Sequence, residues 1–373
     1  MSQKRNALRR RAAVTAGVLV AVGTAAFSAP ALASTNHHRG HFVVRDAVTK
    51  KNPLVIWVDP PRIPAVKAFE KQYPNITVNI TTLSSSASNA GLEAKFELFN
   101  KAGSGWPDAI FWPGNSAIAW AAGPQIHYAA NLKKLIPAKI QKGYPKSVGA
   151  PCHISGGVYC LRNDVAPDVL WYNAKLFKQW GYTPPKTWPQ YEALGLKIAK
   201  QHPGYYVAML GDTYAVDRYM WSSGCPTNDL TGNNTVKINL NAPTCTRVEK
   251  MLDALIKAKV ASPVGIFDTA AASVGKKLVM TPGAAWYGIY LFKDTFKVPA
   301  GQITATAPLQ WPGSPAGTGD EGGGLWSMSN HISGQRQADA VKFMEFMATS
   351  PKWQVNLTTG LPAYRPDDAA WQS

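Results

Sequence analysis

The chain has 373 residues, of which 46% are hydrophobic and 16% charged, and its formal net charge is +17. This length is too great for one small core and predicts about two domains, while the ordinary hydrophobic content excludes a mainly disordered protein. The basic residues are scattered and accompany no recognised nucleic-acid-binding motif, so we expect no nucleic acid partner.

The first 33 residues predict a signal peptide. Five basic residues between Lys4 and Arg11 precede an apolar run from Ala12 to Phe27, and Ala31-Leu-Ala33 has the spacing of a cleavage site. The run is too short for a convincing membrane span. We therefore expect an exported protein that is extracellular, cell-surface-associated or periplasmic, by either the Sec or the twin-arginine route. Because the leader holds no acidic residue, the net charge falls from +17 to +12 on its removal.

The mature chain is expected to begin with a flexible linker at residues 34–52. The linker is polar and contains His37, His38 and His41, which we expect to be solvated in a tail and not to bind a metal. No cysteine precedes Cys152, so the sequence does not predict a lipoprotein.

From Pro53 onward, strands alternate with helices. Apolar periodicity predicts strands at Leu54–Val58, Ile76–Thr82 and Asp108–Trp112, with helices at 63–73 and around 92–99 between them. This order predicts a largely parallel sheet with helices on both faces, and ligands beyond the carboxyl ends of the strands. The loops after Trp57, Leu83 and Phe111 should therefore face a binding cleft.

Four cysteines in an exported chain predict two disulfides, for which three pairings are possible. The local pairings are Cys152–Cys160 and Cys225–Cys245, and each would close a loop. Metal binding is the alternative, but the spacing is not that of a zinc site, so we expect no metal and no cofactor.

The stretch from 158 to 188 predicts a crossing between two lobes. Strands at Val158–Leu161 and Val169–Tyr172 are separated by a polar break at Asn163 and Asp164. The helix and turn signals that follow are Asn173 as a helix start, Gly181 as its end, Pro184 and Pro185 as breakers, and Thr187 with Gln190 as a capping box for the next helix.

The residues after this crossing predict a second lobe. Strands are predicted at Tyr205–Leu210 and Val236–Leu240, with a helix at Tyr214–Ser222 between them. A core-facing helical stripe follows, made of Val248, Met251, Leu252, Leu255 and Ile256.

Several segments together resemble a known family. They are the Tyr-x-Leu-x-x-Asp strand at Tyr159–Asp164, Leu-x-Tyr-Asn-x-x-Leu-Phe at Leu170–Phe177, Pro-Pro-x-Thr-Trp at Pro184–Trp188, Gly103–Trp112, Ala130–Leu135, Gly275–Met280 with Gly283 and Trp286, Ala307–Leu309, Gly322–Trp326 and Gly360–Ala363. In this order they resemble the extracellular solute-binding proteins of ABC importers, of the sugar-binding type related to maltose-binding protein. Each segment alone is a weak signal, but their shared order is not.

The resemblance implies an α/β, two-lobed periplasmic-binding-protein-like fold with discontinuous lobes and a hinge. Lobe 1 would comprise 53–162 and 322–357, including a helix at Gln337–Met347, and lobe 2 would comprise 163–321 and 358–373, with a C-terminal tail shorter than in the family. It also implies a monomer without catalytic activity that captures a mono- or oligosaccharide by hinge closure and presents it to a membrane permease.

A sugar site needs flat aromatic rings for the C–H faces and fixed polar groups for the hydroxyls. The predicted rings are those of Trp57, Trp112, Trp221, Trp286 and Trp326, although a Trp is also a common core residue, as we expect of Trp171 and Trp188. The predicted polar partners are Asp59, Ser84, Asn115 and Asp164, with Gly323 allowing close backbone approach. Asp164 has a second interpretation as a brace for the hinge.

Two other function classes remain open. A secreted carbohydrate-active enzyme needs two carboxylates facing each other across a cleft. Asp320 and Glu321 are adjacent and point oppositely in extended chain, but a pair from distant loops, such as Asp59 with Glu321, would suffice. The basic charge would also suit a binder of anionic cell-wall polymers. Polyamine ligands are disfavoured because the predicted cleft loops hold few carboxylates.

Overall fold

The computed structural model describes residues 48–83, 89–212, 215–232, 235–315, 317–355 and 360–367, all within one compact unit of the chain. The predicted signal peptide, most of the linker and Ser84 lie outside these residues. None of the helices in the described ranges combines the length and the apolar character needed to cross a bilayer.

Lobe 1 is built around a five-stranded sheet and lobe 2 around a three-stranded one. The names lobe 1 and lobe 2 refer to the residue ranges predicted above. The described elements of lobe 1 are β1 (Leu54–Val58), η1 (Pro60–Arg62), α1 (Ile63–Gln72), β2 (Val78–Thr82), α2 (Asn89–Ala102), β3 (Ala109–Trp112), α3 (Ala117–Ala122), η2 (Leu132–Lys134), α4 (Ala138–Lys142), α5 (Lys146–Gly149), η3 (Ala150–Cys152), β4 (His153–Ile154), β5 (Gly157–Val158), β6 (Leu161–Arg162), β15 (Leu325–Met328), α11 (Gly334–Thr349) and α12 (Pro351–Gln354).

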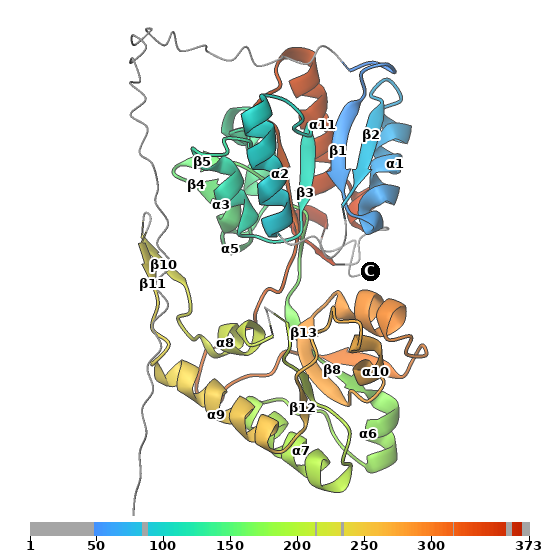
Figure 1. The fold of residues 1–373 in the computed structure, drawn as a ribbon, viewed down its shortest axis with the longest axis vertical. Helices are drawn as coiled ribbons and strands as arrows, with labels where there is room; N and C mark the ends of the chain where they lie inside the picture. Colours follow the sequence, from blue (N-terminus) through green and yellow to red (C-terminus); the bar gives the residue numbers. More distant parts are fainter. Residues whose placement is uncertain are drawn as a thin grey trace, which may run out of the picture. The chain divides into compact units, whose positions relative to one another are not determined.

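The lobe 1 sheet has the strand order β2-β1-β3-β15-β6. β1 pairs in parallel with β2 and β3, whereas β15 is antiparallel to β3 and β6. Figure 1 shows α1 and α11 beside β1 and β2. The prediction of parallel pairing is therefore confirmed for the first three strands, and β15 enters the sheet from much later in the sequence.

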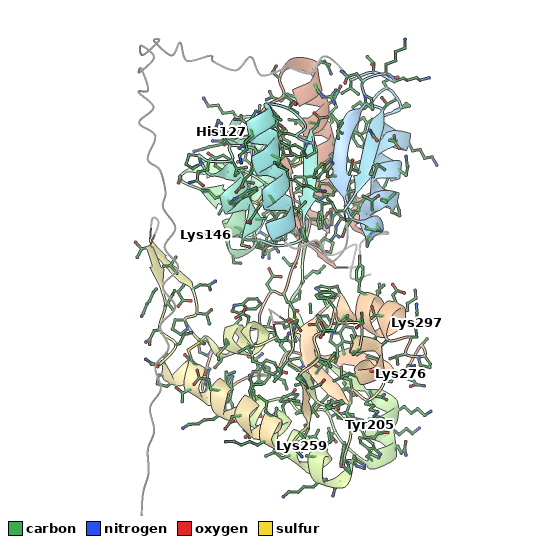
Figure 2. All side chains as sticks on the ribbon, in the orientation of Figure 1. His127, Lys146, Tyr205, Lys259, Lys276 and Lys297 are labelled. Atoms are coloured by element: carbon green, nitrogen blue, oxygen red, sulfur yellow. A yellow bond between two sulfur atoms is a disulfide. The ribbon has the colours of Figure 1, made fainter. Side chains whose placement is uncertain are left out.

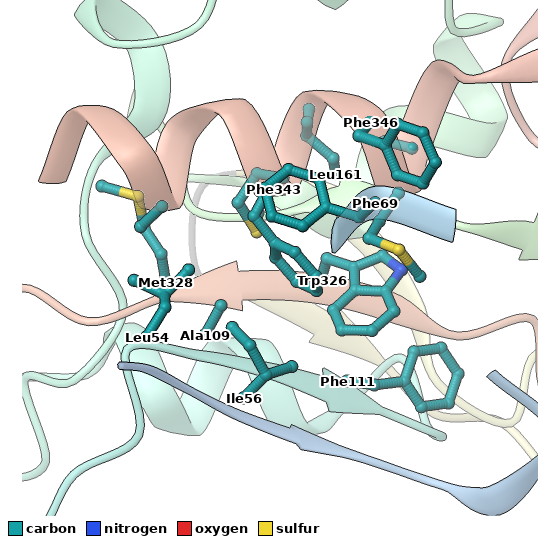
Figure 3. Close-up of a cluster of buried hydrophobic side chains, with 14 of the residues drawn as sticks. Leu54, Ile56, Phe69, Ala109, Phe111, Leu161, Trp326, Met328, Phe343 and Phe346 are labelled. Atoms are coloured by element: carbon teal, nitrogen blue, oxygen red, sulfur yellow. The ribbon is translucent and has the colours of Figure 1, made fainter. Parts of the chain in front are cut away.

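Helices cover both faces of this sheet, so β1, β3 and β15 are largely buried on both sides, whereas the edge strand β2 is partly exposed. On one face, Phe343 and Phe346 of α11 contact Phe69 of α1 with ring centroids 5.1 and 5.6 Å apart, and Trp326 of β15 packs on Phe343 at 5.3 Å (Figure 3). On the other face, Phe96 of α2 lies in a second buried cluster with strand residues of opposite parity. Burying a side chain of this size contributes about 1.5–3 kcal/mol.

Lobe 2 follows the first crossing of the chain. Its described elements are β8 (Asp168–Asn173), α6 (Ala174–Trp180), α7 (Trp188–Gln201), β9 (Ala208–Met209), α8 (Asp217–Ser223), β10 (Asp229–Gly232), β11 (Thr235–Lys237), α9 (Pro243–Lys257), β12 (Ala261–Ser262), α10 (Ala271–Gly275), β13 (Met280–Ala284), the π-helix η4 (Gly288–Thr295) and β14 (Ile303–Thr306). β8 is the central strand of the sheet and pairs antiparallel with β13 and β14.

The crossing segments lie next to each other. β7 (Asp164–Val165) pairs antiparallel with β16 (Leu361–Pro362), just before η5 (Arg365–Asp367). A third segment, residues 317–324, runs from lobe 2 to β15, and we call it the return segment. The four buried hydrophobic clusters each take their residues from one lobe alone. The predicted lobe boundaries remain our proposal, and the described residues 360–367, which were predicted in lobe 2, contact lobe 1 through Arg365, whose N–H donates to the backbone oxygen of Gly143 at 3.0 Å.

Local signals in the sequence were reliable at the crossing. The side chain of Asn173 accepts a hydrogen bond from the backbone N–H of Leu176, and Gly181 ends α6 with a φ of 70°. Thr187 and Gln190 form both hydrogen bonds of the predicted capping box. The two predicted disulfides, Cys152–Cys160 and Cys225–Cys245, are both present.

Three predictions about lobe 2 were wrong in detail. The strand predicted at Val236–Leu240 does not join the lobe 2 sheet: β11 pairs with β10 in a separate hairpin, and Val236, Ile238 and Leu240 are 49%, 64% and 53% exposed. Ile256 is also exposed, and the strand predicted at Tyr205–Leu210 is only two residues long as β9. Alternating apolar residues fit a solvent-facing hairpin as well as a buried strand, so the pattern alone could not separate them.

Candidate ligand-binding site

Three of the predicted aromatic platforms lie in the core of lobe 1. Trp112 and Trp326 are 0% exposed and Trp57 is 8% exposed. The indole N–H of Trp112 donates to Ser327 Oγ at 2.6 Å, and that of Trp326 donates to Asn163 Oδ1 at 2.8 Å. Because helices cover both faces of the sheet, these rings pack between layers and offer no free face. Their predicted role in covering a sugar is therefore corrected to core packing.

Asp59 and Asp164 share one buried arginine at the crossing. Arg62 donates to Asp59 Oδ2 at 2.7 Å and to Asp164 Oδ2 at 3.3 Å, and its guanidinium lies 3.7 Å from the centre of the Phe111 ring. Asp164 Oδ1 also accepts the backbone N–H of Gly324 at 2.9 Å. These contacts support the interpretation of Asp164 as a brace between the crossing and the return segment. Burial raises the pKa of Asp59, and the charge of Arg62 opposes that rise.

The other lobe 1 candidates have different surroundings. Gly323 is buried with a φ of +69°, and a Cβ atom there would lie 2.5 Å from Arg162 Nη2. The close approach that its lack of a side chain allows is therefore to Arg162. Asn115 follows β3, and its buried Oδ1 has no hydrogen-bond partner among the described residues. Asn115 therefore stays in the proposed site, while nothing is described for Ser84.

Trp221 and Trp286 flank the return segment in lobe 2 and remain partly exposed. A Cβ atom on Gly319 would lie 3.0 Å from Trp221 Cε3, and one on Gly322 would lie 3.4 Å from Trp286 Nε1. The indole N–H of Trp286 donates to the backbone oxygen of Glu321 at 2.8 Å. Two indole rings are thus fixed at the two ends of one short glycine-rich segment.

Phe267 extends the aromatic surface at Trp286. The two rings are nearly parallel, at 12°, with centroids 6.2 Å apart, and Phe267 is 61% exposed. Tyr287 and Tyr290 contact the edge of the same indole at 4.6 and 6.0 Å. The exposed ring of Phe267 beside the partly exposed indole of Trp286 suits an apolar ligand face.

A buried ionic group holds the return segment against lobe 2. Arg218 of α8 is 1% exposed and donates to both carboxylate oxygens of Glu321, at 3.0 and 2.9 Å, and to Asp212 at 3.1 Å. The hydroxyl of Tyr287 also donates to Glu321, at 2.9 Å. Sequence analysis considered Glu321 only as a carboxylate of a possible catalytic pair and missed its ion pair, because its partner Arg218 lies 103 positions away.

A family model of bacterial extracellular solute-binding proteins matches residues 60–354, which is most of the chain. The chain belongs to this family. A comparison with curated protein sequences gave no match.

Solved structures share the fold of this solute-binding protein at low sequence identity. One is the ABC-transporter-associated binding protein of B. animalis subsp. lactis Bl-04 in complex with beta-1,6-galactobiose, with a TM-score of 0.68, 22% identity, and coverage of 84% of this chain and 75% of that one. Another is the galacto-N-biose-/lacto-N-biose I-binding protein of Bifidobacterium longum in complex with lacto-N-biose, with a TM-score of 0.71, 18% identity, and coverage of 87% and 80%.

A third similar structure was solved with a different kind of solute. UgpB from Mycobacterium tuberculosis, in complex with glycerophosphocholine, has a TM-score of 0.69, 15% identity, and coverage of 86% and 82%. The two-lobed architecture of this solute-binding protein is therefore established, whereas its ligand has to be argued from its own residues.

Asp168 is a residue of this solute-binding protein that sequence reasoning missed. It begins β8 and is 3% exposed, yet neither carboxylate oxygen has a hydrogen-bond partner among the described residues. Burial raises its pKa well above the ordinary value, and the neighbouring carboxylate of Glu321 raises it further. A Cβ atom on Gly319 would lie 2.3 Å from Asp168 Oδ2, so only glycine fits above it.

The charge around the return segment is opposite to that of the whole solute-binding protein. We call Asp168, Asp212, Asp320 and Glu321, with Arg162 and Arg218, the acidic cluster: four carboxylates share two guanidinium groups. Basic side chains such as Lys146, Lys259, Lys276 and Lys297 are exposed instead (Figure 2). The cluster is thus a local acidic region in a chain of net charge +17.

A small cavity lies elsewhere. It is about 10 Å³ in lobe 1 and is lined in part by Tyr144, His153 and Arg162. Ligand pockets measure roughly 300–1,000 Å³, so this space holds no sugar. The candidate site is therefore defined by side chains around the return segment and not by this cavity.

Proposed function

We propose that this solute-binding protein captures a mono- or oligosaccharide between its lobes and presents it to the permease of an ABC importer. The observation that carries the proposal is the pair of partly exposed indoles, Trp221 and Trp286, fixed beside carboxylates of the return segment. Indole faces suit the C–H surfaces of a sugar ring, and charged acceptors suit its hydroxyls. Two of the structurally similar proteins were solved with disaccharides, which agrees with this ligand class.

The location of the site suggests how binding would be coupled to movement. The return segment belongs to the connections between lobes, and Arg162 of β6 donates to Asp320 of this segment at 3.0 Å. A ligand that contacts the return segment would bias the hinge, which is the usual basis of closure in two-lobed receptors. We expect the protein to act as an exported monomer without catalysis.

A thermal-shift screen against mono- and oligosaccharides tests the ligand class. A sugar present at a hundred times its Kd should stabilise the protein by about 2.7 kcal/mol. Trp286→Ala and Trp221→Ala should each weaken the affinity of the sugar found in this way by about ten-fold or more, since an aromatic contact is worth roughly 1 kcal/mol beyond area burial. Isothermal titration calorimetry measures the change.

The matched control is Trp180→Ala. Trp180 belongs to the same lobe but stacks on His202, with ring centroids 3.6 Å apart, away from the return segment. Its substitution should leave sugar affinity unchanged. If no saccharide stabilises the wild-type protein, the proposed ligand class is wrong. If affinity survives both indole substitutions, the site lies elsewhere.

A further inference from the structure

The acidic cluster holds more negative than positive side chains. Arg218 serves Glu321 and Asp212, and Arg162 serves Asp320, which leaves Asp168 with no guanidinium within hydrogen-bonding distance among the described residues. When every group is ionised, the four carboxylates exceed the two arginines by two negative charges. Burying charge without compensation is unfavourable, so this imbalance needs either a proton or a cation from outside.

Asp168 lies on the indole side of the cluster. A Cβ atom on Gly319 would lie 2.3 Å from Asp168 Oδ2 and 3.0 Å from Trp221 Cε3, so the carboxylate and the indole both adjoin this glycine. Asp320, the next residue, keeps 40% of its side chain exposed, which gives the cluster an edge open to solvent. Carboxylates next to an electron-rich indole face form an environment that attracts a positively charged group.

On the basis of the proposed function, we infer that the saccharide bound here carries a protonated amine, as in an amino sugar. The ammonium group supplies the positive charge that the acidic cluster lacks, while the sugar ring lies on indole. No group of three or more His, Cys, Asp or Glu side chains in the described part of the chain is arranged to hold a metal ion, which favours an ammonium group over a metal cation. The sequence argument against amine ligands rested on a shortage of cleft carboxylates, and the structure removes that shortage.

Calorimetric titration of the mature wild-type protein with matched sugars tests this inference. The probes are glucosamine, N-acetylglucosamine and glucose, the corresponding galactose series, and the β-1,4-linked glucosamine dimer with cellobiose. In a series that binds, the amine should have a Kd about ten-fold or more below those of its neutral counterparts, because hydrogen bonds to charged groups contribute about 1.5–3 kcal/mol. Raising the salt concentration should reduce that preference.

Two variants connect the preference to the cluster. Asp168→Asn keeps the size of the side chain but removes one negative charge, and it should reduce the preference for the amine to less than about three-fold. Asp320→Asn should reduce it in the same direction from the exposed edge. Asp253→Asn on α9, an exposed carboxylate paired with Lys257, makes the same change in charge elsewhere and should keep the preference.

The outcomes separate the two proposals. Equal or tighter binding of a neutral sugar by the wild-type protein overturns the inference about the amine and leaves the saccharide receptor in place. Preference for the amine that survives both cluster variants also overturns it. If none of these sugars binds, the inference about the amine is wrong, and the thermal-shift screen against other saccharides decides the proposed function. Tighter binding of putrescine than of any amino sugar contradicts the saccharide.

Discussion

The carboxylate of Asp168 is buried beside that of Glu321, and its pKa is raised well above the ordinary value by burial first and by Glu321 second. Arg218 opposes this rise, whereas Asp320 adds to it. A carboxyl group with a raised folded-state pKa favours the folded protein below its unfolded-state pKa. That contribution is lost as the pH rises through the folded-state value.

Asp168→Asn should therefore make the ligand-free protein more stable than the wild type at the upper end of the pH range. The difference should shrink as the pH falls toward about 4, the ordinary pKa of an Asp carboxyl, because Asp168 becomes protonated in both states below that pH. Thermal unfolding followed from about pH 4 to pH 9 measures it. For the surface variant Asp253→Asn, stability should depend on pH as it does in the wild type. If Asp168→Asn also shows the wild-type pH dependence, the raised pKa of Asp168 is not its cause.

Residues whose role depends on near neighbours were predictable from the sequence. Asn173, Gly181 and the pair Thr187 and Gln190 act within four positions of the chain, and the structure has them as expected. Trp112 was wrongly assigned to the binding site because the sequence at the end of a strand does not show that helices cover both faces of the sheet. Arg218 and Asp168 were missed because the residues beside them, Glu321 and Gly319, come from distant parts of the chain.

At the scale of elements, the disulfide Cys225–Cys245 joins the end of α8 to the first turn of α9. The intervening chain includes the hairpin of β10 and β11, and the three residues of β11 are exposed. The covalent link therefore limits the freedom of a segment that the core of lobe 2 does not hold. A loop of this kind gains stability mainly through its unfolded state.

Replacing both Cys225 and Cys245 by Ser should lower the free energy of unfolding by about 3 kcal/mol in the chain-entropy model, since the two positions are 20 residues apart. The shorter link, Cys152–Cys160, spans 8 positions and should be worth about 2.5 kcal/mol. Chemical denaturation measures both variants against the wild type. An unchanged denaturation midpoint for the Cys225 and Cys245 double variant would show that this disulfide does not stabilise the protein by restricting the unfolded chain.

Strands of the first sheet were easier to predict than the hairpin. Leu54–Val58 was predicted with the bounds that the structure gives to β1. Leu54–Val58 is an unbroken apolar run, whereas Val236–Leu240 alternates apolar and polar residues, and its apolar side chains are exposed. Periodicity reports the local conformation of a segment, whereas burial depends on what the rest of the chain places next to it.

At the scale of the whole molecule, the described connections between the lobes are β7 and the return segment, and the return segment is tied to the crossing by Arg162 and Asp164. β16 pairs with β7, and the chain after it contacts lobe 1, where the N–H of Arg365 donates to the backbone oxygen of Gly143. Closure must then bend a small set of neighbouring backbones, and the lobes can move as units because each has its own buried core.

Addition of a bound saccharide should therefore lower the radius of gyration measured by small-angle X-ray scattering, since closure makes the particle more compact. Trp286→Ala at the same sugar concentration should show a smaller decrease, because less of the protein is bound. A scattering profile that saturating ligand leaves unchanged would rule out hinge closure as the response, even if calorimetry detects binding.

The position of β15 has a consequence for biosynthesis. This strand fills the gap between β3 and β6, although Leu325 follows its partner Trp112 by about 210 residues. While the ribosome is still making lobe 2, the sheet of lobe 1 lacks an interior strand and α11 has not been translated. The nascent polypeptide must then stay incompletely folded until its final portion emerges, which leaves a long interval in which translocation machinery or a chaperone can engage it.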